Sequence, residues 1–123
     1  MNAITANIIK GPADVTAIVG ESLLLPCEMS GDLNQDNVFG WRVDRKYEEN
    51  VIIFETPPDI LHDRDMYNVT GRFNLYIGKV SLTHAGYYTC YHGNQDRSAH
   101  VVVMGKINLI KLYSLILIKP SNL

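Results

Sequence analysis

The chain has 123 residues, of which 46% are hydrophobic and 20% are charged. This length fits one domain, and this composition allows a core of ordinary size. The formal net charge of −2 gives no reason to expect nucleic acid or an anionic membrane as a partner.

Short runs of alternating apolar and polar residues, separated by turn residues, predict an all-β domain with about nine strands and no confident helix. In chain order, the predicted strands cover residues 7–10, 14–19, 21–28, 38–44, 51–55, 66–70, 73–77, 86–92 and 99–104. Polar stretches at 30–37, 45–50 and 92–98 are predicted loops, and the segment 56–59, with two prolines, is predicted to end a strand.

The alternation also assigns a face to each side chain, because successive side chains of a strand point to opposite sides of the sheet. Cys27 shares its face with Leu23 and Leu25, and Trp41 shares its face with Phe39 and Val43. The inward set is completed by Phe73, Leu75 and Ile77 on a later strand and by Tyr88 and Cys90 on the strand after it. Both cysteines are therefore predicted to face the core.

Cys27 and Cys90 are the only cysteines, and no CxxC motif or Cys/His cluster accompanies them. This favours a disulfide in an oxidising compartment over a metal site. The alternative is a cytosolic protein with two buried free thiols. Residues 1–6 have neither a basic region nor an apolar run of the length that a leader needs. We expect an extracellular or cell-surface chain whose leader is missing from this sequence.

The set Cys27, Trp41 and Tyr87-Tyr88-Thr89-Cys90 resembles the immunoglobulin superfamily. The resemblance covers about residues 11–104 and implies a two-sheet Greek-key β-sandwich with one disulfide between the sheets. In that fold Trp41 packs on the sulfurs, and the Tyr88 hydroxyl is tied back to the backbone. Residues 1–10 are predicted to be an N-terminal segment, and residues 105–123 an apolar tail.

The sequence departs from the family pattern at the corner before Cys90. His84 stands where the family has an aspartate, which usually pairs with an arginine for which Arg72 is in the right neighbourhood. The segment from Arg72 to Cys90 is short, so a reduced D strand is expected. The last strand lacks a Gly-x-Gly bulge, which favours a variable-type or intermediate-type receptor domain over an antibody chain. Residues 65–67 resemble those of butyrophilin-like co-signalling ligands, and leukocyte adhesion receptors are about as close.

Asn68-Val69-Thr70 is the only N-glycosylation sequon, and a glycan there would cover the sheet built from strands A, B, E and D. The opposite GFCC′ sheet would then be the free protein surface. Its predicted partner-binding residues are Arg42, Asp44, Thr89, Tyr91, Asp96, Arg97 and His100, with Val102, Met104 and the loop 92–98 beside them. Such residue types are enriched in interfaces. The alternative is an ordinary solvated sheet whose Arg/Asp pairs contribute little.

No catalytic or cofactor-binding pattern is found. His62, His84, His92 and His100 are scattered, and there is no phosphate loop or nucleophile motif. We therefore expect no enzyme activity, no cofactor and no metal. The predicted function is extracellular protein recognition or adhesion by an immune-type cell-surface receptor or ligand, through the GFCC′ sheet. The alternative is a soluble secreted binder or decoy without signalling. Homophilic and heterophilic partners both remain open.

The C-terminal tail is apolar from residue 107 to residue 118. As a helix this segment would span about 18 Å, against about 30 Å for a bilayer core, so it is not predicted to cross a membrane. It also follows the last predicted strand. Two interpretations are left: translated read-through beyond an exon boundary at Gly105-Lys106, or a disordered extension.

Overall fold

A computed structural model describes residues 7–31, 37–105 and 114–117 of the chain. The strands are β1 (Asn7–Lys10), β2 (Val15–Ile18), β3 (Leu23–Leu25), β4 (Glu28–Ser30), β5 (Phe39–Asp44), β6 (Val51–Thr56), β7 (Ile60–Leu61), β8 (Asn68–Thr70), β9 (Asn74–Ile77), β10 (Gly86–His92) and β11 (Gln95–Met104). A 3-10 helix, η1, covers Leu82–His84. Most of the predicted apolar tail, residues 106–113 and 118–123, lies outside the described residues.

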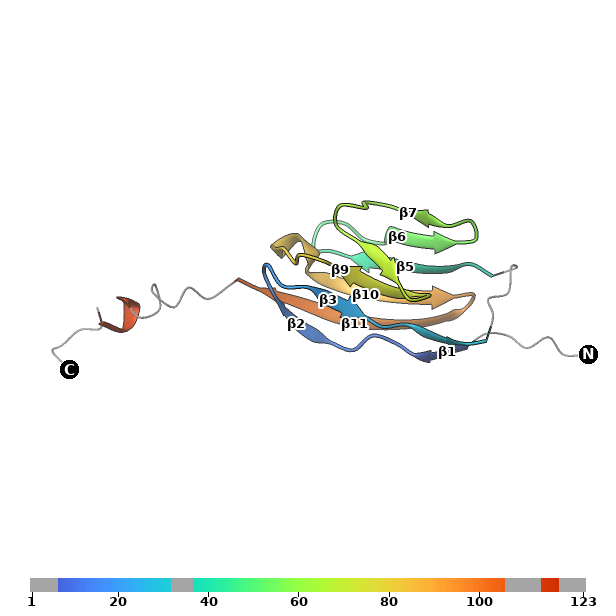
Figure 1. Ribbon diagram of the computed structural model, residues 1–123, viewed down its shortest axis with the longest axis horizontal. Coiled ribbons are helices and arrows are strands. Elements are labelled where there is room, and N and C mark those ends of the chain that lie inside the picture. The colour runs from blue at the N-terminus through green and yellow to red at the C-terminus, as the bar shows by residue number, and fades with distance from the viewer. Residues whose placement is uncertain (1–6, 32–36, 106–113, 118–123) are drawn as a thin grey trace, which may run out of the picture.

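The strands form two layers (Figure 1). The larger layer, called the front sheet, has the order β2-β11-β10-β5-β6-β7, and the back sheet has the order β3-β9-β8. A separate ribbon pairs β1 with β4. Strand β2 pairs with β11 in parallel. The other neighbours in this sheet are antiparallel: β11 with β10, β10 with β5, β5 with β6, and β6 with β7. The predicted all-β immunoglobulin-like sandwich is confirmed.

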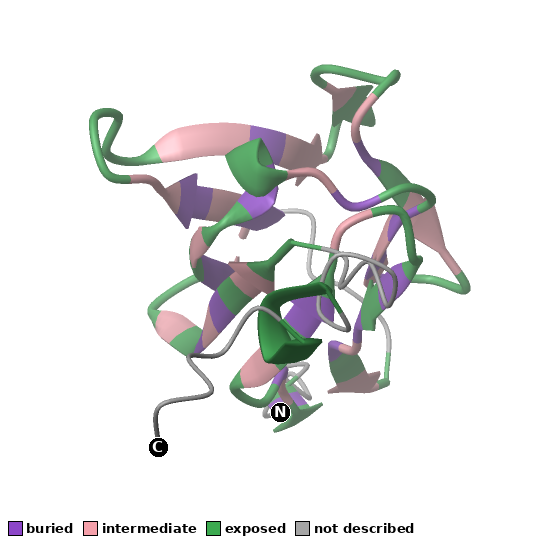
Figure 2. Ribbon diagram, turned by 90° about the vertical axis from the view of Figure 1, so that its left-hand side faces the viewer, coloured by how far each residue is buried: buried purple, intermediate pink, exposed green. Residues whose placement is uncertain are grey.

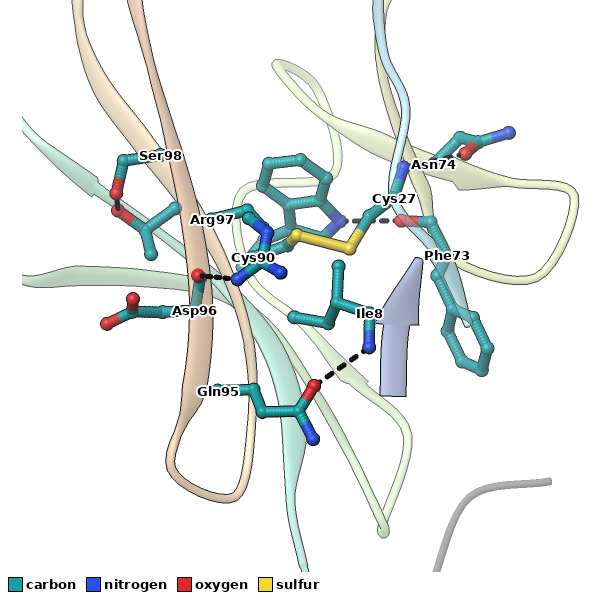
Figure 3. Close-up of a disulfide and its surroundings, with 11 residues drawn as sticks. Ile8, Cys27, Phe73, Asn74, Cys90, Gln95, Asp96, Arg97 and Ser98 are labelled. Atoms are coloured by element: carbon teal, nitrogen blue, oxygen red, sulfur yellow. Dashed lines mark hydrogen bonds between the residues drawn. A yellow bond between two sulfur atoms is a disulfide. The ribbon is translucent and has the colours of Figure 1, made fainter. Parts of the chain in front are cut away.

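The core is built around the predicted cross-sheet disulfide between Cys27 and Cys90. Trp41 is fully buried, and its indole Nε1 donates a hydrogen bond of 2.6 Å to the carbonyl oxygen of Phe73 (Figure 3). Buried residues alternate with more exposed ones along the strands, and most residues of the connecting turns are exposed, apart from core residues such as Tyr67, Phe73 and Val80 (Figure 2). The inward face predicted for both cysteines, for Trp41 and for Tyr88 is confirmed.

Next to the core, η1 forms a corner held by a buried hydrogen-bond network. The Tyr88 hydroxyl donates to the carbonyl oxygen of His84 at 2.6 Å and lies 3.0 Å from the Tyr67 hydroxyl. Arg45, in the turn after β5, donates to the Tyr67 hydroxyl at 2.7 Å. Burial raises the pKa of Tyr88, so its hydroxyl remains a donor. The predicted tie between Tyr88 and the backbone is therefore present.

The arginine expected at this corner is not Arg72. That residue lies in the turn between β8 and β9, where its guanidinium sits 4.9 Å from the centre of the Phe73 ring and donates to the Gly31 carbonyl oxygen at 3.3 Å. The turn that holds Arg72 precedes β9, whereas η1 follows β9, so the two lie toward opposite ends of that strand. Arg45 supplies the cation at the corner instead.

One predicted loop and two short strands differ between the sequence analysis and the structure. Residues 92–98 are mostly strand, because β11 begins at Gln95 and only Gly93 and Asn94 connect it to β10. The left-handed φ of +59° at Gly93 suits such a tight hairpin. Strands β4 and β7 were not predicted. Strand β1, predicted as part of an N-terminal segment, packs its buried Ile8 into the core.

Removing the Tyr88 hydroxyl should destabilise the domain. Tyr88→Phe leaves the buried Tyr67 hydroxyl and the His84 carbonyl with one hydrogen-bond partner fewer, and we expect a loss of about 1–3 kcal/mol in the free energy of unfolding. Urea denaturation measures this loss. Tyr87→Phe is the matched control, because Tyr87 precedes Tyr88 in the same strand and is half exposed. Equal effects of the two substitutions would contradict a structural role for the Tyr88 hydroxyl.

His84 should make the stability depend on pH. Its Nδ1 accepts a hydrogen bond of 2.9 Å from the backbone N–H of Ser81, and burial lowers its pKa. In the window between this lowered pKa and the ordinary histidine pKa, the unfolded state binds more protons than the folded state. The free energy of unfolding therefore rises with pH through that window and falls on acidification.

The measurement is the free energy of unfolding from pH 7 down to pH 5 for the wild type and for His84→Asn, whose side-chain oxygen can also accept from Ser81 N–H. The wild type should lose more stability than the variant as the pH falls. The other histidines are common to both proteins, so the difference between the two curves isolates His84. Parallel curves would show that His84 does not titrate with folding.

Candidate binding face on the front sheet

The outward side chains of the front sheet form rows across its strands, fixed by the register. The first row runs Asp96, Tyr91, Gly40, Glu55; the second runs Ser98, Thr89, Arg42, Ile52; and the third runs His100, Tyr87, Asp44. Beyond these rows Val102 lies opposite Thr16, and Met104 lies opposite Ile18. This arrangement decides which of the predicted residues share one surface.

Tyr91 occupies the space over a glycine. A Cβ at Gly40 would collide with the Tyr91 ring and would lie 2.7 Å from the carbonyl oxygen of Phe54. The ring therefore reaches across β5, and its hydroxyl donates to the Glu55 carboxylate at 2.9 Å. Burial, together with this bond, raises the pKa of Tyr91, so the hydroxyl donates throughout the physiological range.

Arg42 extends the same network toward β11. Its guanidinium lies 5.2 Å from the centre of the Tyr91 ring, and its Nη2 is 3.9 Å from Oδ2 of Asp96. The exposed ion pair contributes little to stability by itself. Its effect is positional, because Arg42, Tyr91, Glu55 and Asp96 hold one another in a single layer near the β10–β11 hairpin. Arg42 comes from the second register row and the other three from the first, and we call these four residues the polar row.

Thr89 does not contribute to the exposed face, in contrast to the prediction. It points outward by register, but it is only 3% exposed, and its hydroxyl lies 2.7 Å from the hydroxyl of Ser98. A threonine between Tyr87 and Tyr91 is too short to reach beyond its neighbours. Thr89 is therefore a cross-strand contact within the sheet rather than a residue that a partner can touch.

Tyr87 and His100 form the third row as a stacked pair. Their ring centres are 4.2 Å apart, and their planes are inclined by 6°. The backbone N–H of His100 donates to Oδ1 of Asp14 at 2.8 Å, which joins β11 to the segment before β2. A surface hollow of about 620 Å³ opens beside the pair, and its lining includes Asp44, Lys46 and Glu49.

Apolar side chains are exposed on the same face of the front sheet, farther along the strands from the β10–β11 hairpin than the polar row. Tyr87 is 54% exposed, Val102 is 42% exposed and Met104 is 52% exposed. Ile18 is also exposed and lies opposite Met104 in the parallel pairing of β2 and β11. We call Ile18, Tyr87, Val102 and Met104 the lower front patch. Exposed apolar side chains that lie together on a sheet are the usual mark of an interaction site.

The structure thus brings together five of the seven predicted partner-binding residues, namely Arg42, Asp44, Tyr91, Asp96 and His100. Arg97 is not among them. It lies opposite Cys90 in the β10–β11 pairing, so its side chain leaves from the core side of the sheet, where it donates to the Asp96 carbonyl at 2.9 Å (Figure 3). Arg97 is exposed but lies on the other side of β11 from these five residues, a placement that the interpretation of residues 92–98 as a loop did not provide.

Four further residues of this face, Ile18, Gly40, Glu55 and Tyr87, are not among the predicted partner-binding residues. One signal was available for Gly40, because a glycine at an outward position of a central strand often marks a close approach by another group. Asn68, the sequon residue, is exposed on β8 at the edge of the back sheet. It therefore lies on a different sheet from the front face.

Residues 7–31, 37–105 and 114–117 contain no group of three or more His, Cys, Asp or Glu side chains placed to share a metal ion. Both cysteines are bonded to each other. Across the same described residues, no helix combines the length and apolar character needed to cross a bilayer.

Comparison with known proteins identifies the family of this chain. Residues 10–106 match the profile of the immunoglobulin V-set domain. Human Contactin-4 is 32% identical over 83 residues, which are 68% of this chain and 8% of that protein. Human Protogenin is 32% identical over 107 residues, 86% of this chain and 8% of that protein. The chain therefore spans less than a tenth of the length of these relatives.

Among solved structures, the extracellular domains of the voltage-gated sodium channel beta4 subunit share the fold. The TM-score is 0.63 at 20% sequence identity, with 81% of this chain and 91% of that chain covered. That protein forms parallel homodimers described as explaining its role in cell-cell adhesion. At this identity the likeness supports the fold alone.

The contact between Gly40 and Tyr91 can be tested by a double-mutant cycle. Gly40→Ala should cost about 1–3 kcal/mol of unfolding free energy, because the added methyl group displaces the Tyr91 ring and crowds the Phe54 carbonyl. In a Tyr91→Ala background the first of these effects disappears. We therefore expect a coupling of about 0.5–2 kcal/mol, measured by urea denaturation. Additive effects would mean that Tyr91 does not lie over Gly40.

Proposed function

Because the chain belongs to the immunoglobulin V-set family, we propose that it is an extracellular recognition domain that binds another protein through its front sheet. The V-set family is non-catalytic, so binding is the activity to be explained. Fold alone does not identify a ligand, and the proposal therefore rests on the surface described above.

The observation that carries the proposal is the lower front patch beside the polar row. Tyr87, Val102 and Met104 offer apolar area that a partner can remove from water. The polar row beside them is already internally paired, as the rim of an interface often is. An apolar centre with a polar rim is the arrangement in which a few residues supply most of the binding free energy.

The partner we propose is another protein's ectodomain, either a second copy of this chain or a different protein. The sodium channel beta4 subunit, which shares the fold, forms parallel homodimers, so a second copy of this chain is one of the partners to be tested. The net charge of −2 supports protein rather than an anionic polymer as the partner. We also propose a cell-surface location, in keeping with the disulfide.

Two finer statements belong to the same proposal. The first is that Asn68 carries an N-linked glycan, which its exposed position in an Asn-x-Thr sequon supports. The second is an immune-type receptor or ligand, supported by the resemblance of residues 65–67 to co-signalling ligands. A soluble secreted binder is the second candidate, and it would use the same front sheet.

Charge placed in the lower front patch should weaken recognition. We expect Val102→Arg to weaken binding roughly tenfold or more, because the cation must be desolvated without a partner. Fluorescent beads coated with the 123-residue chain are mixed with beads carrying the same chain and with beads carrying a panel of cell-surface ectodomains. Bead aggregation and the affinity of each pair that aggregates are the measurements.

Ile9→Arg is the matched control, because Ile9 is an apolar strand residue, 63% exposed, in the ribbon of β1 and β4 outside the front sheet. It should bind as the wild type does. Equal losses for both variants, or no loss for Val102→Arg, would place the binding site elsewhere. If no pair of beads aggregates with the wild type, the recognition function itself is contradicted.

A further inference from the structure

The back sheet carries a row of three outward residues that includes the sequon asparagine. Asn68 on β8 lies directly opposite Tyr76 on β9, and Tyr76 lies directly opposite Leu24 on β3. Residues on either side of this row, such as Leu23, Leu25 and Leu75, are buried in the core. The alternation of the strands therefore places Asn68, Tyr76 and Leu24 together on the outer face.

The two residues beside Asn68 in this row, Tyr76 and Leu24, offer largely apolar side chains. Leu24 is 51% exposed, and Tyr76 is half-buried. The Tyr76 ring extends along its strand over Gly78, since a Cβ at Gly78 would lie 3.5 Å from Cε1 and 4.0 Å from the hydroxyl oxygen. The ring thus extends along the sheet surface toward Gly78, and the Tyr76 side chain remains partly accessible.

We propose that the first sugar of an N-linked glycan on Asn68 packs on Tyr76 and Leu24. The inference rests on the proposed glycosylation of Asn68 and adds the surface that receives the glycan. N-acetylglucosamine carries C–H groups on one face of its ring and a methyl group on its acetamide. These groups suit an aromatic face and a leucine side chain, and the contact removes apolar area from water.

The geometry of the row permits this contact. Directly opposite residues of an antiparallel pair have Cβ atoms about 5 Å apart, so a sugar on Asn68 starts beside Tyr76. The Asn68 Oδ1 accepts a hydrogen bond of 2.8 Å from the backbone N–H of Val69, which restricts the amide whose nitrogen carries the glycan. No charged side chain belongs to the row of Asn68, Tyr76 and Leu24.

The same glycan would protect an exposed strand edge. Strand β8 is the outer strand of the back sheet and is only three residues long. Outer strands present unpaired backbone groups that can pair with another chain. A bulky, hydrated glycan attached at the first residue of β8 hinders such pairing and leaves the front sheet for recognition.

The test uses the full chain secreted from mammalian cells, and mass spectrometry of the Asn68 peptide first establishes whether the residue is glycosylated. The melting temperature is then measured for three forms of the wild type and of Tyr76→Thr. The forms carry the whole glycan, a single N-acetylglucosamine left by an endoglycosidase, or no sugar in Asn68→Gln. Tyr87→Thr, which alters an exposed tyrosine of the front sheet, is the matched control.

In the wild type and in Tyr87→Thr, the single sugar should retain most of the stabilisation, and its loss should lower the melting temperature by about 4 °C. In Tyr76→Thr this difference should largely disappear. The acetamide methyl resonance of the sugar should also show a ring-current shift that Tyr76→Thr removes. An equal temperature difference in all three proteins, with no ring-current shift, would overturn the packing while leaving the glycosylation intact. An unmodified Asn68 would instead contradict the glycosylation and, with it, the packing.

Discussion

The packing of Trp41 against the Cys27–Cys90 disulfide is the contact on which the rest of the structure depends. Cys90 lies opposite Trp41 in the pairing of β10 and β5, so the sulfurs and the indole are neighbours. The indole N–H also reaches Phe73, beside the back sheet, and thereby adds a hydrogen bond to the covalent link between the layers. Closing a loop of this size contributes about 4 kcal/mol in the chain-entropy account. Because strands alternate, burying Cys90 also turns Tyr91 outward, so the binding face follows from the core.

The corner at η1 shows how a family feature can be replaced. The family's aspartate usually pairs with an arginine. Here His84 accepts a hydrogen bond from the backbone N–H of Ser81, and the cation of the corner is Arg45, which donates to the Tyr67 hydroxyl and not to a carboxylate. Arg45 belongs to the turn between β5 and β6, which borders the front sheet. The substituted network therefore anchors that turn to the core, whereas the family's ion pair would anchor the D strand.

Much of the fold could be predicted from the sequence, because strand alternation and the Cys, Trp and Tyr positions act together. The failures arise where pairing overrides composition. Gln95 and the residues after it are polar, yet they extend β11 because β10 provides a hairpin partner for them. Because Arg97 was expected in a loop, alternation was not applied to it, and its side of the sheet was not predicted. Thr89 shows a different limit, since alternation predicts direction but not exposure. The contact between Tyr91 and Gly40 requires the register between two strands, which no single-strand pattern contains.

The two faces of the sandwich expose different side chains to solvent: a paired polar set on the front face, and Tyr76 and Leu24 on the back face. On the front face, Arg42, Tyr91, Glu55 and Asp96 already satisfy one another, so a partner that covers them removes fewer unpaired charges from water. The net gain on binding can then come from the apolar side chains below them. On the back face, the sugar that we propose on Asn68 would cover the row of Tyr76 and Leu24 without the entropic cost of recruiting a separate molecule. The proposed recognition surface and the proposed glycan thus lie on opposite sheets because side chains alternate along each strand.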